Sequence, residues 1–110
     1  MQANVVGWDI GGAHVKAAVI SADKVIAVYQ QPCPLWKGLD QLQHAVNTIM
    51  QKLAGSNHRH AMTMTGELVD LFDNRDHGVK QIIQTMTDLL PGTEILVFAG
   101  RQGFLKAPHI

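Results

Sequence analysis

The chain has 110 residues, and its nine basic and nine acidic side chains give a formal net charge of zero. Hydrophobic residues make up 46% of it and charged residues only 16%, which predicts a single domain, residues 1–110, with a real core. Neither sign of charge forms a run, so the composition excludes an electrostatic footprint for nucleic acid or for an anionic membrane. A small phosphorylated ligand is compatible with it.

Cysteine content and the amino-terminal sequence bear on the cellular compartment. Cys33 is the single cysteine and cannot form an internal disulfide. No basic segment followed by an apolar stretch precedes the first predicted strand, and no apolar run approaches membrane-spanning length. These features predict a soluble protein of the reducing cytoplasm.

The first third of the chain predicts an antiparallel meander. Three runs rich in β-branched residues are separated by a glycine turn and by a short link, and they cover Asn4 to Asp9, His14 to Ile20 and Lys24 to Gln31. Gly11 and Gly12 can adopt positive φ, which would make the first turn tight. Trp8 is expected to face a helix on the side of the sheet opposite to Asp9.

Two helices and two strands are predicted in the rest of the chain. Apolar residues at three- and four-residue spacing indicate helices from Leu39 to Leu53 and from Val79 to Leu90. Runs at His60 to Thr65 and at Glu94 to Ala99 indicate strands, the second of them apolar enough to be covered on both faces. Trp36 is expected to pack where the first helix begins.

This order, β-β-β-α-β-α-β, restricts the topology. Because crossovers through helices are right-handed, it predicts an α/β fold with a five-stranded mixed sheet in the order 3-2-1-4-5. The carboxyl ends of strands one, four and five then share one edge, where ligands bind in such sheets. Three glycine-marked loops are therefore expected to meet there: Asp9 to Gly12, Gly66-Glu67 and Gly100 to Gly103.

The first of these loops has the composition of a phosphate site. Backbone amides of a glycine turn can hold an anion, and Asp9 at the strand end could hold a divalent cation through water. Lys16 supplies a positive charge from the next strand. The alternatives are a turn-forming aspartate and a solvent-facing lysine. The predicted phosphate-binding residues are Gly11, Gly12, Ala13, His14 and Lys16.

Residues of the other two loops are weaker candidates. Glu67 could act as a general base or orient a metal-bound water, the alternative being a plain loop carboxylate. Arg75 and Arg101 could clamp a further phosphate through their planar guanidinium groups. For Arg75 the favoured alternative is pairing beside a helix cap formed by Asp73 or Asn74. The histidine cluster His58-Arg59-His60 lacks the partners of a zinc site and is expected to form a solvated loop.

The segment Asp9-Ile10-Gly11-Gly12-Ala13-His14-Val15-Lys16 resembles the first phosphate motif of the superfamily that contains acetate and sugar kinases, chaperone ATPases and actin. Within it the chain is similar to the hydantoinase A/oxoprolinase family. The block Met64 to Phe72, with Arg75, Gly78 and Val79, resembles the branch linked to tetrahydromethanopterin-dependent one-carbon metabolism and methanofuran biosynthesis. The resemblance implies a ribonuclease-H-like fold, and Mg²⁺ with ATP or a diphosphate substrate as ligands.

For function, the resemblance implies the amino-terminal half of an enzyme that forms an ether by transfer to a phenol, with pyrophosphate leaving. An ATP-dependent amidohydrolase of the hydantoinase or 5-oxoprolinase kind is one alternative. Another is an inactive module that self-associates through the face exposed by a missing second half. Ala13 departs from the motif, which often has Thr or Ser there, so a hydroxyl that could contact phosphate is missing.

Overall fold

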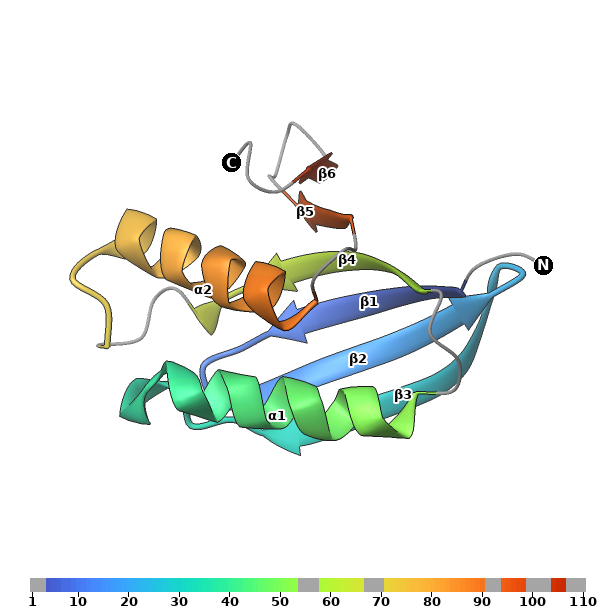
Figure 1. Ribbon diagram of the computed structural model, residues 1–110, viewed down its shortest axis with the longest axis horizontal. Coiled ribbons are helices and arrows are strands. Elements are labelled where there is room, and N and C mark those ends of the chain that lie inside the picture. The colour runs from blue at the N-terminus through green and yellow to red at the C-terminus, as the bar shows by residue number, and fades with distance from the viewer. Residues whose placement is uncertain (1–3, 54–57, 67–70, 91–93, 99–103, 107–110) are drawn as a thin grey trace.

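The computed structural model describes residues 4–53, 58–66, 71–90, 94–98 and 104–106. Within these ranges a single mixed sheet is covered by two α-helices and a short 3₁₀ helix (Figure 1). The strands are β1 (Asn4–Ile10), β2 (His14–Ser21), β3 (Lys24–Pro32), β4 (His58–Met64), β5 (Ile95–Phe98) and β6 (Phe104–Lys106). The helices are η1 (Leu35–Lys37), α1 (Leu39–Lys52) and α2 (Arg75–Leu89).

The strand order is β3-β2-β1-β4-β5-β6. Strand β2 is antiparallel to β1 and to β3, whereas β4 runs parallel to β1, and β5 runs parallel to β4. The predicted order 3-2-1-4-5 is therefore confirmed. Strand β6 pairs antiparallel with β5 and extends the sheet. Its three residues are too few to carry a periodic signal in the sequence.

Both helices lie on the same face of the sheet (Figure 1). The connections from β3 to β4 and from β4 to β5 move in the same direction across the sheet, so right-handed crossovers place α1 and α2 on one side. The core lies between this face and the helices. On β1 and β2 it takes every second residue, namely Val6, Trp8, Ile10, Val15, Ala17 and Val19.

The other face of the sheet is not covered by any described residue. Val28 on β3 is 66% exposed and Phe98 on β5 is 48% exposed, although Val97 beside it is buried. The expectation that the fifth strand is covered on both faces is thus wrong for the part of the chain that the structure describes. Neither α-helix is long and apolar enough to cross a membrane, a statement that applies to the described residues.

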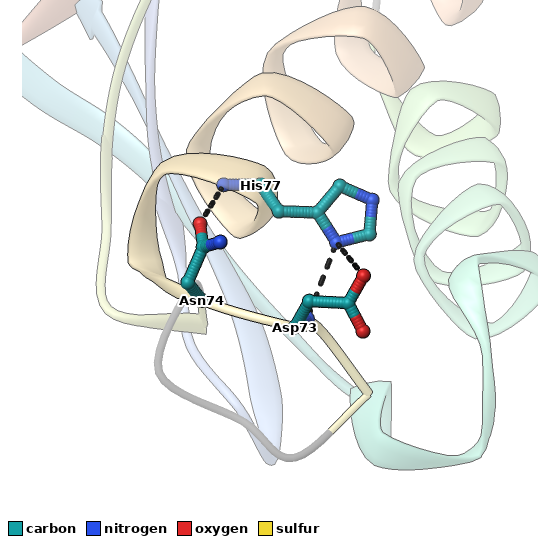
Figure 2. A network of polar contacts seen from close by, with 3 residues as sticks. All are labelled: Asp73, Asn74 and His77. Atoms are coloured by element: carbon teal, nitrogen blue, oxygen red, sulfur yellow. Dashed lines mark hydrogen bonds and ion pairs between the residues drawn. The ribbon is translucent and has the colours of Figure 1, made fainter.

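The start of α2 is fixed by an asparagine cap (Figure 2). The side-chain oxygen of Asn74 accepts a hydrogen bond from the amide of His77 at 2.8 Å, which satisfies one of the free donors of the first turn. His77 Nδ1 in turn accepts from the amide of Asp73 at 3.3 Å, and its ring meets Phe72 edge to face. The capping role predicted for Asp73 or Asn74 is confirmed for Asn74.

Two predictions about aromatic and histidine residues are wrong. Trp36 is 59% exposed and lies beside the Lys37 ammonium, 5.1 Å from the ring centroid, because the neighbouring Leu35 is the residue that packs inward. His58 and His60 belong to β4 rather than to a solvated loop, and His60 is 3% exposed. Alternation along β4 directs His60 toward the helices, the same side as Trp8.

Trp8 and His60 form a buried polar pair within the core. The indole N–H of Trp8 donates to Nδ1 of His60 at 2.9 Å, and the two rings are stacked with centroids 6.1 Å apart. Burial lowers the pKa of His60 to about 4, with a smaller contribution from nearby His58. Because Nδ1 accepts the indole hydrogen bond, it carries no proton in the folded protein. The lowered pKa agrees with this, since it keeps His60 neutral near pH 7.

We expect this pair to make the fold sensitive to acid. His60 binds a proton near pH 6.5 when unfolded but only near pH 4 when folded, so its contribution to stability is present above pH 6.5 and falls as the pH drops toward 4. The free energy of unfolding should fall by about 2 kcal/mol between pH 7 and pH 5. Urea unfolding at the two pH values measures it. His60→Gln should remove most of this change of the free energy of unfolding with pH. His44→Gln, a control at an exposed site on α1, should leave the change as it is.

Candidate phosphate site

The carboxyl ends of β1 and β4 are packed directly against each other. The amide of Thr65 donates to the carbonyl of Ile10 at 2.9 Å. An ideal Cβ placed on Gly66 would lie 3.2 Å from the carbonyl oxygen of Gly11 and 2.7 Å from Cδ2 of Leu35. Two of the three predicted loops therefore meet at one edge. The third, Gly100 to Gly103, lies outside the described residues.

The glycine turn between β1 and β2 is tight for a reason other than the predicted one. Neither Gly11 nor Gly12 has a positive φ; within the described ranges Gly38 is the glycine that does. Gly11 is needed for close approach, since its amide donates to the carbonyl of His14 at 3.0 Å and an added Cβ would lie 3.0 Å from that same oxygen. The expectation of left-handed glycines is wrong for this turn.

The segment that follows β3 is hydrogen-bonded to the glycine turn through two backbone amides. The amide of Leu35 donates to the carbonyl of Gly12 at 3.1 Å, and the amide of Cys33 donates to the carbonyl of Ala13 at 2.7 Å. The amides of Gly12 and Ala13 have no hydrogen-bond acceptor among the residues that the structure describes. The carbonyls of Gly12 and Ala13 are thus engaged, while their amides have no acceptor within the described ranges, an arrangement that can bind an anion.

Asp9 and Lys16 lie side by side on the uncovered face of the sheet. They are direct partners across the β1–β2 pair, and Thr63 is the partner of Asp9 on β4. Both charged side chains are exposed, and within the described ranges neither takes part in an ion pair. With Thr63 they line one part of a hollow of about 590 Å³ on this face. The carboxylate is thus accessible to a cation from solvent.

Other site predictions are placed only in part. Glu67 and Arg101 lie outside the described residues. The prediction that the Asp9 and Glu67 carboxylates face the same cleft therefore stays a prediction. Arg75 is the first residue of α2 and is exposed. Cys33 is buried, and burial raises the pKa of its thiol, so this cysteine is not an activated nucleophile.

The residues at this edge fit a magnesium–phosphate ligand better than a metal bound by protein groups alone. No cluster of three or more metal-binding side chains exists in the described part of the chain. Mg²⁺ is usually held by one or two carboxylates together with water and the phosphates of its ligand. Asp9 could supply one such carboxylate, and the amides of Gly12 and Ala13 could face a phosphate. Sequence reasoning missed the bracing by Cys33 and Leu35, because such backbone contacts have no residue signature.

Comparisons with solved structures identify the fold. An inorganic polyphosphate/ATP-glucomannokinase from Arthrobacter sp. strain KM superposes with a TM-score of 0.62 over 88% of this chain and 44% of that chain, at 18% identity. A Ppx/GppA phosphatase from Aquifex aeolicus gives 0.52 over 92% of this chain and 37% of that chain, at 12% identity. The chain therefore has the actin-like ATPase fold, with a ribonuclease-H-like sheet order.

One curated protein is similar to this chain in sequence as well. The chain is 32% identical over 85 residues to (4-{4-[2-(gamma-L-glutamylamino)ethyl]phenoxymethyl}furan-2-yl)methanamine synthase from Methanocaldococcus jannaschii. The match covers 76% of this chain but only 24% of the synthase, so the chain spans about a quarter of that protein's length. No protein-family profile matches the sequence. Membership of the hydantoinase A/oxoprolinase family is not shown by these comparisons.

The packing of Gly66 can be tested with a matched pair of glycine substitutions. Gly66→Ala places a methyl group against the fully buried Leu35 and the turn carbonyl, so it should destabilise the fold by about 1–3 kcal/mol. Gly7→Ala places the same group 3.9 Å from the nearest atom, the carbonyl oxygen of Ala18, and should be neutral or slightly stabilising. Chemical unfolding of both variants measures the difference. Equal stabilities would contradict the close contact.

Proposed function

We propose that this chain is the phosphate- and metal-binding part of an enzyme that acts on a phosphorylated small molecule. The observation that carries the proposal is the combination at the β1 end. The exposed Asp9 carboxylate has no ion-pair partner among the described residues, and it is followed by a turn in which the amides of Gly12 and Ala13 have no acceptor in that same part of the chain. Phosphoryl and pyrophosphoryl chemistry depends mainly on positioning and on stabilising negative charge. Both requirements are served by rigid backbone donors and a cation site.

The roles proposed for individual residues follow from their places. The amides of Gly12 and Ala13 bind phosphate oxygens, and Asp9 holds a magnesium ion through its hydration shell. Lys16, next to Asp9, offsets the charge of the ligand. Glu67 follows Gly66, and Gly66 packs on the turn, which supports a role for Glu67 in orienting water or substrate. Arg75 and Arg101 are proposed as weaker phosphate clamps.

For the reaction, we propose an ether-forming transfer with release of pyrophosphate, in methanofuran biosynthesis and one-carbon metabolism. Support comes from the 32% identity to the methanamine synthase and from the phosphate motif. ATP or a diphosphate substrate with Mg²⁺ would be the ligand, and the enzyme would work in the cytoplasm. The match covers a quarter of the synthase, so the remaining groups of the active site are expected from other parts of such a protein.

An ATP-dependent amidohydrolase is the alternative reaction, since the phosphate motif is compatible with both. Product analysis separates them. Incubation with a furan-methyl diphosphate and a phenol should release pyrophosphate if the chain takes part in the transfer. Release of inorganic phosphate from ATP only when hydantoin or 5-oxoproline is present would support the amidohydrolase and contradict the transfer.

The metal role of Asp9 is tested by calorimetric titration of inorganic pyrophosphate and of ATP into the chain, with and without Mg²⁺. We expect Mg²⁺ to strengthen binding of the unmodified chain. Asp9→Asn should weaken the magnesium-dependent binding at least about tenfold, since a neutral amide loses a charge-assisted contact of roughly 1.4 kcal/mol or more.

Asp88→Asn is the matched control, because Asp88 is an exposed aspartate on α2 whose loss removes the same charge elsewhere. It should leave both affinities unchanged. Binding that is identical in the unmodified chain and in Asp9→Asn would remove the metal role. An unmodified chain that binds neither ligand at millimolar concentration would contradict the phosphate site itself.

A further inference from the structure

Thr65 is a polar residue at the candidate site that has no role in the proposed function so far. It directly follows β4 and is exposed, and its amide donates to the carbonyl of Ile10 at 2.9 Å. Its hydroxyl has no hydrogen-bond partner among the residues that the structure describes. The backbone of Thr65 is therefore fixed at the end of β1, while its hydroxyl is available to a ligand.

The hydroxyl of Thr65 lies beside the glycine turn. An ideal Cβ placed on Gly11 would lie 3.8 Å from Oγ1 of Thr65. A side chain at position 11 would thus begin within contact distance of this hydroxyl, and glycine leaves the space beside it open. Thr65 comes two residues after Thr63, the partner of Asp9, so strand alternation places it on the same side of the sheet as Asp9.

One phosphate group can reach this hydroxyl and a turn amide together. Backbone geometry places the amide nitrogen of Gly12 about 2.4 Å from Cα of Gly11, and hence at most about 8 Å from Oγ1 of Thr65. A phosphate that accepts hydrogen bonds of about 2.8 Å at two of its oxygens bridges donors over this range. The hydroxyl is a donor whose hydrogen can rotate toward such an oxygen.

We propose that the Thr65 hydroxyl donates a hydrogen bond directly to the phosphate group of the ligand. This inference rests on the proposed phosphate site at the amides of Gly12 and Ala13. Asp9 lies two residues before Gly11, roughly 6.6 Å back along the strand, so its carboxylate and the hydroxyl occupy successive levels on one side of the sheet. The carboxylate serves the cation and the hydroxyl serves the anion. The ligand is accordingly a phosphate ester or diphosphate whose phosphate group is recognised without the metal as well.

Calorimetric titration of inorganic pyrophosphate into the chain, with and without Mg²⁺, tests the proposal. Thr65→Val keeps the shape of the side chain but removes the hydroxyl, so it should weaken binding at least about tenfold in both conditions. Thr65→Ser keeps a hydroxyl and should bind within about threefold of the unmodified chain. Thr87→Val is the matched control and should leave the affinity unchanged, because Thr87 is exposed on α2 and donates to the carbonyl of Ile83 in its own helix.

Asp9→Asn separates the role of the hydroxyl from that of the carboxylate. Without Mg²⁺ it should not weaken pyrophosphate binding, since it removes a negative charge near an anion, whereas Thr65→Val should still weaken it. A loss in Thr65→Val that is confined to Mg²⁺ would assign the hydroxyl to the hydration shell of the metal and overturn the direct contact. Equal losses in Thr65→Val and Thr65→Ser would indicate a structural effect and overturn it as well.

Failure of this inference can be distinguished from failure of the proposed function. If the unmodified chain binds pyrophosphate and Thr65→Val binds it equally well, the role of Thr65 is wrong and the phosphate site stands. If the unmodified chain binds no pyrophosphate at millimolar concentration, the phosphate site is wrong, and the role of Thr65 is wrong with it.

Discussion

The handedness of two crossover connections determines how this molecule is arranged. Both connections step the same way across the sheet, from β3 to β4 and from β4 to β5, so a right-handed path leaves both helices on one side. That single constraint creates the core, buries Trp8 with His60 between sheet and helices, and leaves Asp9 and Lys16 on the opposite, accessible face. It also brings the parallel strands β1 and β4 to an end at the same edge, where the glycine turn lies.

Most of the fold could be predicted from the sequence because each element has a strong local signal. The apolar spacing from Leu39 onward and the alternation along the first three runs are independent of tertiary context, and the strand order follows from connection rules. Features that depend on packing could not be predicted. Whether Leu35 or Trp36 turns inward depends on how η1 meets the sheet, and His60 is buried because β4 is central and has the same alternation as β1.

For the candidate site, sequence reasoning predicted that the turn after Asp9 and the segment at Gly66 meet at one sheet edge, but not how they pack there; binding of phosphate or a metal at this edge stays a prediction. The motif around Asp9 correctly indicated an exposed carboxylate beside a glycine turn, because strand alternation and the Gly-Gly pair are local properties. It misjudged why the glycines are there. Gly11 allows a close approach to the nearby carbonyl of His14, whereas Gly66 allows its segment to touch Gly11, more than fifty positions earlier in the chain. Long-range contact of this kind has no signature in a single sequence, and the roles of Glu67 and Arg101 remain predictions.

The hydrogen bonds from Cys33 and Leu35 to the turn also have a mechanical consequence. They couple the turn to η1, and η1 leads directly into α1, so displacement of the turn is transmitted to a segment that carries a solvent-facing indole. Trp36 is therefore a built-in fluorophore near the loop, while the second indole, Trp8, is sealed in the core and serves as an internal reference. The emission of this protein is divided between one solvent-exposed indole and one buried indole.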